Sequence, residues 1–209
     1  MKVFCLIIAL VFGVTFIALP RNAGGWFWDA GGALGLLAFA GLMFQMVPYA
    51  RTVTSKRHQT LGYWVLGTAV LHAFWLLIGD DVVRFYLQAG APLYMWLGLA
   101  SLIVLAVLAI IAKMPDRARL TRRFATFRLV HRILGFATII TATLHIVLSG
   151  FYYPSWPQIA LVVLMVAAMC FGRPVWTRLS APPTASGLAF LVVGVLAVGA
   201  FVLVRNVAS

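Results

Sequence analysis

Charged residues, and acidic ones above all, are scarce in this chain of 209 residues. Only 10% of the residues are charged, four of these are aspartates and none is glutamate, whereas 64% are hydrophobic. A soluble globular domain is nearer half apolar and a quarter charged. The mean hydropathy of +1.04 points the same way. The composition therefore excludes an ordinary soluble domain and predicts an all-α integral membrane protein, for which the bilayer acts as the solvent.

Several other functional classes lack the residues that they need. The two cysteines, Cys5 and Cys170, both lie inside apolar segments, so we interpret them as small apolar residues and not as a disulfide framework. There is no glycine-rich phosphate loop between a strand and a helix. The net charge of +12 comes from basic residues that gather in short loops between apolar segments, which is the positive-inside pattern of membrane proteins. We therefore expect contact with a lipid bilayer and no binding of nucleic acid.

Seven apolar segments predict a bundle of six to seven transmembrane helices in a single domain, residues 1–209. They cover about residues 3–19, 31–49, 58–78, 92–112, 127–151, 158–171 and 187–204. The first segment is longer than the apolar part of a usual signal peptide and lacks a clean cleavage site, so we expect it to be a retained helix. Gly32, Gly35 and Gly41 in the second segment are expected to allow close helix contacts.

The loops between these segments predict the orientation in the membrane. The loops after the second, fourth and sixth segments are basic, whereas those after the first, third and fifth are nearly free of lysine and arginine. Basic loops stay in the cytoplasm, so the N-terminus is expected to be cytoplasmic and, with seven helices, the C-terminus periplasmic. The third and fifth helices then run parallel. We expect a multi-pass protein of the bacterial inner membrane.

Histidine is the most informative of the scarce residues. The third segment holds His58 and His72, the fifth holds His131 and His145, and the chain has no other histidine. The members of each pair are 14 residues apart, which is roughly four helical turns, so both lie on nearly the same face and about 21 Å apart. Because the two helices are expected to be parallel, the four side chains form two levels. His58 and His131 are expected at the cytoplasmic end, with His72 and His145 toward the outer side.

Facing imidazoles at two levels suit two stacked haems, each held by one histidine from each helix. A neutral imidazole nitrogen is a good donor to iron, and its second nitrogen can be fixed by a backbone carbonyl or a hydroxyl. Thr68, Thr138 and Thr141 are nearby hydroxyls that we consider for this role. Two histidines fill both axial positions of the iron, which favours electron transfer over chemistry on a bound substrate.

A zinc or di-iron site would require carboxylates or four converging ligands. The acids lie in loops or at helix ends, at Asp29, Asp80, Asp81 and Asp116. Three arginines near the cytoplasmic histidines are candidate partners for haem propionates, although each is equally well explained as an ordinary positive-inside residue: Arg57, Arg128 and Arg132. The basic stretch 117–128 is a candidate docking surface for an acidic partner.

Two motifs resemble a known family. They are His58-Gln59-Thr60-Leu61-Gly62-Tyr63-Trp64 with Leu71-His72, and Val130-His131-Arg132-Ile133-Leu134-Gly135 with Leu144-His145. Both resemble the helices with paired histidines of the ferric reductase-like transmembrane domain family. That family includes the membrane parts of ferric reductases and NADPH oxidases and the haem subunit of the bacterial methionine sulfoxide reductase system. The segment Met46-Val47-Pro48-Tyr49-Ala50-Arg51 is similar to the end of that family's second helix.

The resemblance covers about residues 30–172 and leaves the segment 187–204 as an additional helix. It implies two haem b groups, held by the four histidines, that move electrons across the membrane from a cytoplasmic flavin donor. The absence of a flavin or nicotinamide domain fits the haem subunit of the sulfoxide reductase system and a stand-alone ferric reductase-like subunit equally well.

We therefore expect the electron-transfer subunit of an oxidoreductase, with no catalytic residues of its own. It would relay electrons from a separate cytoplasmic flavoprotein or a quinol to a periplasmic redox partner. Three alternatives stay open: a haem-free structural subunit of a larger membrane complex, a proton or metal transporter with a histidine relay, and a cytochrome b561-like protein that uses quinone or ascorbate.

Overall fold

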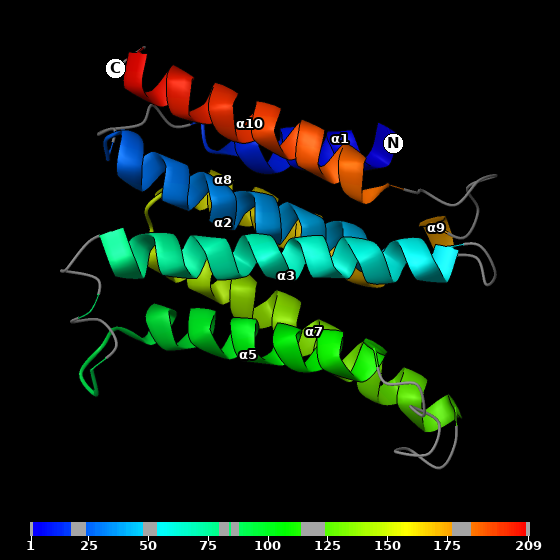
Figure 1. Ribbon diagram of the computed structural model, residues 1–209. Helices are drawn as coiled ribbons and strands as arrows, with labels where there is room; N and C mark the ends of the chain where they lie inside the picture. Colours follow the sequence, from blue (N-terminus) through cyan, green and yellow to red (C-terminus); the bar gives the residue numbers. More distant parts are fainter. Residues whose placement is uncertain are drawn as a thin grey trace.

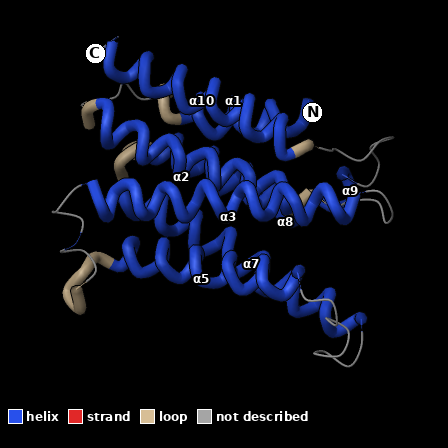
Figure 2. Tube along the Cα trace, in the orientation of Figure 1, coloured by secondary structure: helices blue, strands red, loops and turns tan. Residues whose placement is uncertain are grey.

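The protein is a bundle of helices that lie side by side and alternate in direction along the chain (Figure 1). The computed structural model describes residues 2–17, 24–47, 54–79, 84, 88–113, 124–176 and 185–207. The helices are α1 (Lys2–Val14), α2 (Trp26–Gln45), α3 (Thr54–Gly79), α5 (Leu93–Lys113), α7 (Phe124–Ser149), α8 (Trp156–Phe171), α9 (Arg173–Trp176) and α10 (Gly187–Val207). Figure 2 shows only helix and loop in this described part. The two chain ends lie at opposite ends of the bundle.

Five of the described helices are long and apolar enough to cross a membrane: α2, α3, α5, α7 and α10. The shorter apolar helices are α1 and α8. The chain is thus a multi-pass, all-helical membrane protein, which confirms the class expected from the composition. The first helix is shorter than the apolar segment 3–19, because i to i−3 hydrogen bonds close its end at Thr15 and Phe16.

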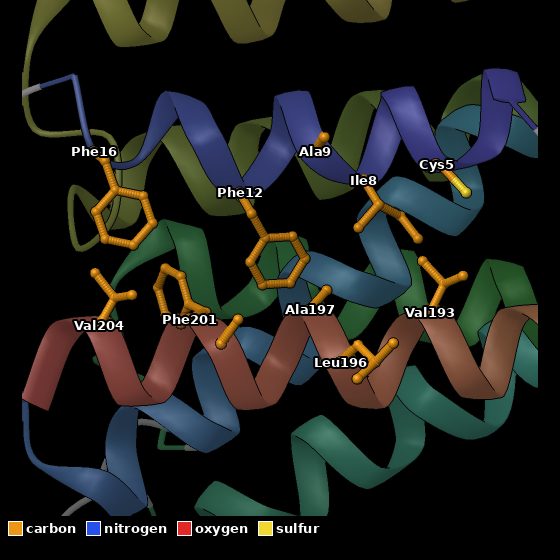
Figure 3. Close-up of a pocket in the computed structure, with 11 residues that line it drawn as sticks. Cys5, Ile8, Ala9, Phe12, Phe16, Val193, Leu196, Ala197, Phe201 and Val204 are labelled. Carbon is orange, nitrogen blue, oxygen red and sulfur yellow. The ribbon is translucent and has the colours of Figure 1, made fainter.

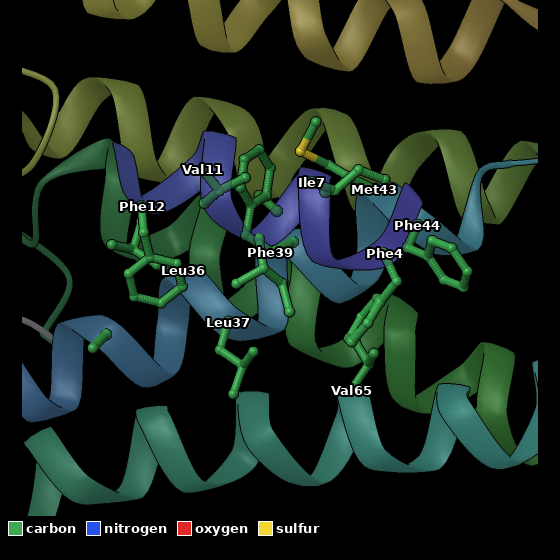
Figure 4. Close-up of a cluster of buried hydrophobic side chains, with 14 of the residues drawn as sticks. Phe4, Ile7, Val11, Phe12, Leu36, Leu37, Phe39, Met43, Phe44 and Val65 are labelled. Carbon is green, nitrogen blue, oxygen red and sulfur yellow. The ribbon is translucent and has the colours of Figure 1, made fainter. Parts of the chain in front are cut away.

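Helix α2 is the most buried helix and lies against α1, α3 and α10. Large side chains from α1 and α2 fill the space between them, and Phe4 packs edge-to-face on Phe44 with ring centres 5.2 Å apart (Figure 4). Glycines allow the close approach expected from the sequence. A Cβ at Gly41 would meet Val65 of α3 at 2.5 Å, and one at Gly194 would meet Leu37 of α2 at 2.6 Å.

A buried polar cluster holds α10 against α2. The Arg205 Nε–H donates to Asp29 Oδ1 at 2.9 Å, and the two side chains are only 6% and 1% exposed. Asn206 Nδ2 donates to the second carboxylate oxygen of Asp29 at 3.0 Å. The Arg205 guanidinium also lies over the ring of Tyr152, 5.3 Å from its centre. A buried charge is stable only when it is paired, so this cluster fixes α10 in the bundle. This helix is the one that follows the segment of about residues 30–172.

The second half of the bundle is built from α5 and α7, which pack closely on each other, and α3 contacts both α2 and α5. In the described residues α3 and α7 are not a closely packed pair. They run in the same direction, as the basic loops predict (Figure 1). Many outward side chains of α3 and α7 are apolar and exposed, such as Ile78 and Ile133, as expected for a surface in contact with lipid.

Candidate functional site

The four histidines face one another across α3 and α7 in two pairs. The ring centres of His58 and His131 are 6.1 Å apart, and those of His72 and His145 are 6.4 Å apart. Two metal–imidazole bonds of about 2 Å each, with roughly 1 Å from each nitrogen to its ring centre, give a separation of about 6 Å. Each pair therefore has the spacing that a single metal ion between two imidazoles requires.

At the second level, α2 fixes the ring of His72. Its Nδ1 is 2.7 Å from the carbonyl oxygen of Gly31. A carbonyl oxygen only accepts hydrogen bonds, so Nδ1 carries the proton and Nε2 keeps the lone pair that can bind a metal. The ring lies directly against Gly35, where a Cβ would come within 2.9 Å of the His72 Cε1 atom.

Helix α5 fixes His145 in the same way. Its Nδ1 is 2.6 Å from the carbonyl oxygen of Tyr94, which again leaves Nε2 with the lone pair. The ring lies against Gly98, where a Cβ would come within 2.7 Å of Nδ1. Both histidines of this level are thus held by helices other than their own.

The first level has a different environment. His131 stacks on Phe127, one turn earlier in α7, with ring centres 5.8 Å apart. Gln45 Nε2 of α2 donates to the backbone oxygen of His58 at 3.0 Å. Within the described part of the chain, His131 Nδ1 and Gln45 Oε1 are buried without a hydrogen-bond partner. Buried polar atoms are normally paired, so this level has polar groups that water or a bound molecule would satisfy.

The geometry fits haem because, within the part of the chain that the structure describes, each level offers two imidazole donors that face each other. Among the described residues, no group of three or more histidine, cysteine or acidic side chains gathers as a metal cluster would require. A family model described as the ferric reductase-like transmembrane component matches residues 34–142, which is just over half of the chain.

The chain belongs to the ferric reductase-like transmembrane component family. The matched segment begins in α2 and ends in α7, and it includes His58, His72 and His131, whereas His145 lies three residues beyond it. Membership indicates an electron-transfer role in the membrane. Neither the comparison with curated proteins nor that with solved structures gives a match.

The three threonines do not orient the histidines of this family member, and that prediction is wrong. The hydroxyls of Thr68, Thr138 and Thr141 donate to carbonyls four residues earlier in their own helices. A helical threonine reaches that carbonyl without changing the backbone, so the local bond prevails. The other group expected to fix the second imidazole nitrogen, a backbone carbonyl, is the one that His72 and His145 contact. Gly35 was expected only to allow a close helix contact and Gly98 was not singled out, although Leu-Gly-Leu occurs at both 34–36 and 97–99.

The arginines considered for haem propionates are exposed and lie on the same two helices as the first histidine level. Arg57 precedes His58 in α3, and Arg128 and Arg132 flank His131 in α7. Their role as propionate partners stays a prediction. Residues 117–123 of the expected docking surface, the segment 48–51, and Asp80, Asp81 and Asp116 lie outside the described residues.

An apolar groove of about 400 Å³ lies between α1 and α10 (Figure 3). Side chains such as Ile8, Phe12 and Leu196 line it. The lining includes none of the four histidines. The groove is therefore separate from the candidate site.

Proposed function

We propose that the protein is a di-haem b-type membrane cytochrome that relays electrons across the bilayer. The observation that carries this proposal is the presence of two facing imidazole pairs, 6.1 and 6.4 Å apart between ring centres. His58 and His131 would hold one haem, and His72 and His145 the other. When bound, haem iron supplies a one-electron redox couple. Because each pair would supply two imidazoles to one iron, neither level would leave a metal site open to a substrate.

The distance between the levels suits transfer across a membrane. Fourteen residues of α3 separate His58 from His72, which is about 21 Å along the helix, and the hydrocarbon core is about 30 Å thick. One level therefore lies near each face. The α3 residues between the levels are mainly apolar or aromatic, with glycine, threonine and, next to His58, Gln59. Such a lining favours electron transfer over a proton or metal relay, which needs polar groups along its path.

The direction of transfer follows from the basic loops. They favour a cytoplasmic position for the His58–His131 level, so electrons would enter there from a separate flavoprotein or a quinol. They would leave from the His72–His145 level to a periplasmic acceptor of the bacterial inner membrane. Exposed Arg57, Arg128 and Arg132 would contact the propionates of the first haem or attract an acidic donor. The protein would thus act as the electron-transfer subunit of an oxidoreductase.

The first experiment is an absorption spectrum of the purified protein, oxidised and then reduced with dithionite, with haem counted per chain. We expect sharp b-type bands and two haems. The double variants His58→Ala/His131→Ala and His72→Ala/His145→Ala should each keep one haem, and Thr68→Ala, a matched control on α3, should keep both. A colourless wild-type protein would overturn the proposal in favour of a histidine relay or a structural subunit.

A further inference from the structure

Two helix pairs of the bundle use the same contact to hold a histidine. In the pair α2 and α3, His72 donates to the Gly31 carbonyl and its ring lies against Gly35. In the pair α5 and α7, His145 donates to the Tyr94 carbonyl and its ring lies against Gly98. In both, a glycine follows the accepting residue by four positions. We call this arrangement the carbonyl–glycine motif.

The sequence repeats along with the contact. His-x-x-Leu-Gly followed by an aromatic residue begins at both 58 and 131, and Leu-His ends the repeat at 71–72 and 144–145. The partner helices carry Leu-Gly-Leu at 34–36 and 97–99. The two helix pairs therefore share a sequence pattern as well as the contact, and the glycine of the motif has the same place in each.

The position of the glycine has a physical reason. In an α-helix the carbonyl of residue i accepts from the N–H of residue i+4, and its oxygen keeps a second lone pair. A side chain at i+4 covers the turn before its own Cα, which is where that carbonyl lies. Gly35 and Gly98 leave the second lone pair open to an imidazole. A Cβ would come within 2.9 Å of His72 Cε1 at position 35 and within 2.7 Å of His145 Nδ1 at position 98, so the ring would have to move.

We propose that Gly35 and Gly98 are positioning residues that hold His72 and His145 with Nδ1 protonated and Nε2 available as the ligand nitrogen. The ligand part of this proposal rests on the proposed function. A carbonyl that accepts from Nδ1 makes the imidazole a more basic ligand. Greater basicity stabilises ferric over ferrous iron, so the motif lowers the reduction potential of the His72–His145 level.

The contact can be tested without reference to haem. In the full chain labelled with ¹⁵N at histidine only, NMR follows the exchange of each Nδ1 proton with deuterium, in haem-free or dithionite-reduced protein. We expect two slowly exchanging Nδ1 protons in the wild type. Gly35→Ala should make one of them exchange quickly and Gly98→Ala the other. A wild type without any slowly exchanging histidine proton would overturn the proposal.

The effect on the cofactor is tested by a redox titration of the same variants. Gly35→Ala and Gly98→Ala should each raise the potential of one of two steps and lower the haem affinity of that level about 10- to 100-fold. Gly67→Ala is the matched control, because it lies on α3 opposite the histidines and its Cβ would meet nothing within 4 Å. Glycine variants that titrate like Gly67→Ala would overturn the proposal. If the wild type binds no haem, the proposed function fails while the NMR measurement still decides the contact.

Discussion

The two histidine levels differ in what holds their side chains. At the second level, His72 and His145 each donate to a carbonyl of a neighbouring helix and lie against a glycine. At the first level, His131 stacks on Phe127 of its own helix, and its Nδ1 is buried without a hydrogen-bond partner among the described residues. The second level is thus fixed by contacts between helices, whereas at the first level the ring of His131 is held by a stack within its own helix.

This difference predicts how the two levels behave. A site whose ligands are already held in place loses less conformational entropy on binding, so it binds more tightly. The His72–His145 level should therefore take up haem first and release it last. The His58–His131 level should be the more adaptable one, with polar atoms still to be satisfied. The following variants test this contrast between the two levels.

The largest effect is expected from removing a ligand of the second level. His72→Ala should reduce the haem content from two to one per chain and abolish electron transfer across the membrane, because no other donor replaces the imidazole. His131→Ala should also remove one haem, from the other level. Haem counting and vesicle assays with an impermeant electron acceptor measure both results. Two haems per chain in either variant would contradict the pairing.

The next effect is expected at the buried ion pair. Asp29→Ala leaves the buried Arg205 without its carboxylate, which should lower the free energy of unfolding by about 3–5 kcal/mol. Because Asp29 is two residues from Gly31, heating should release haem from the His72–His145 level before the other, reversing the wild-type order. Thermal unfolding followed at the haem bands measures this. The double variant with Arg205→Ala should lose less than the sum of the single changes, and strict additivity would contradict the coupling.

A smaller effect is expected at the first level. Gln45→Leu removes the bond to the His58 carbonyl, which is worth about 1 kcal/mol, so the haem affinity of this level should fall roughly fivefold. The His72–His145 level should be unchanged. The loss of haem on dilution measures the affinity. The two steps of a redox titration of the diluted protein show from which level the haem was lost. An equal loss at both levels would show that the levels are not independent.

The smallest effect is expected from the exposed arginines. Arg57→Gln and Arg128→Gln change surface charges, which are worth about 0–1 kcal/mol each. Reduction by an acidic donor should slow at low ionic strength and return to the wild-type rate in high salt. Stopped-flow rates over a salt series test this. A loss of haem in these variants would place the arginines on the propionates instead of on a docking surface.

The class of the protein and the pairing of its histidines could be predicted from the chain alone. The predicted apolar segments locate the ends of α2, α3, α5, α7 and α10 to within five residues. The 14-residue spacing and the basic loops also indicate which histidines face each other. The groups that orient the rings could not be predicted, because Gly31 and Tyr94 act through backbone oxygens, which every residue carries.

Spacing along a helix and the cost of placing charge in a membrane are local properties. The chain alone therefore predicts the five long apolar helices, the parallel course of α3 and α7, and the two histidine levels, whereas α1 and α8 are shorter than the other predicted spans. The contacts between helices are visible only in the folded chain, where threonine hydroxyls bond to their own helices while carbonyls of α2 and α5 hold His72 and His145. The fold also pairs Asp29 with Arg205 across 176 residues. Such contacts depend on how closely two helices approach, and that distance is set by packing between helices and not by any one segment.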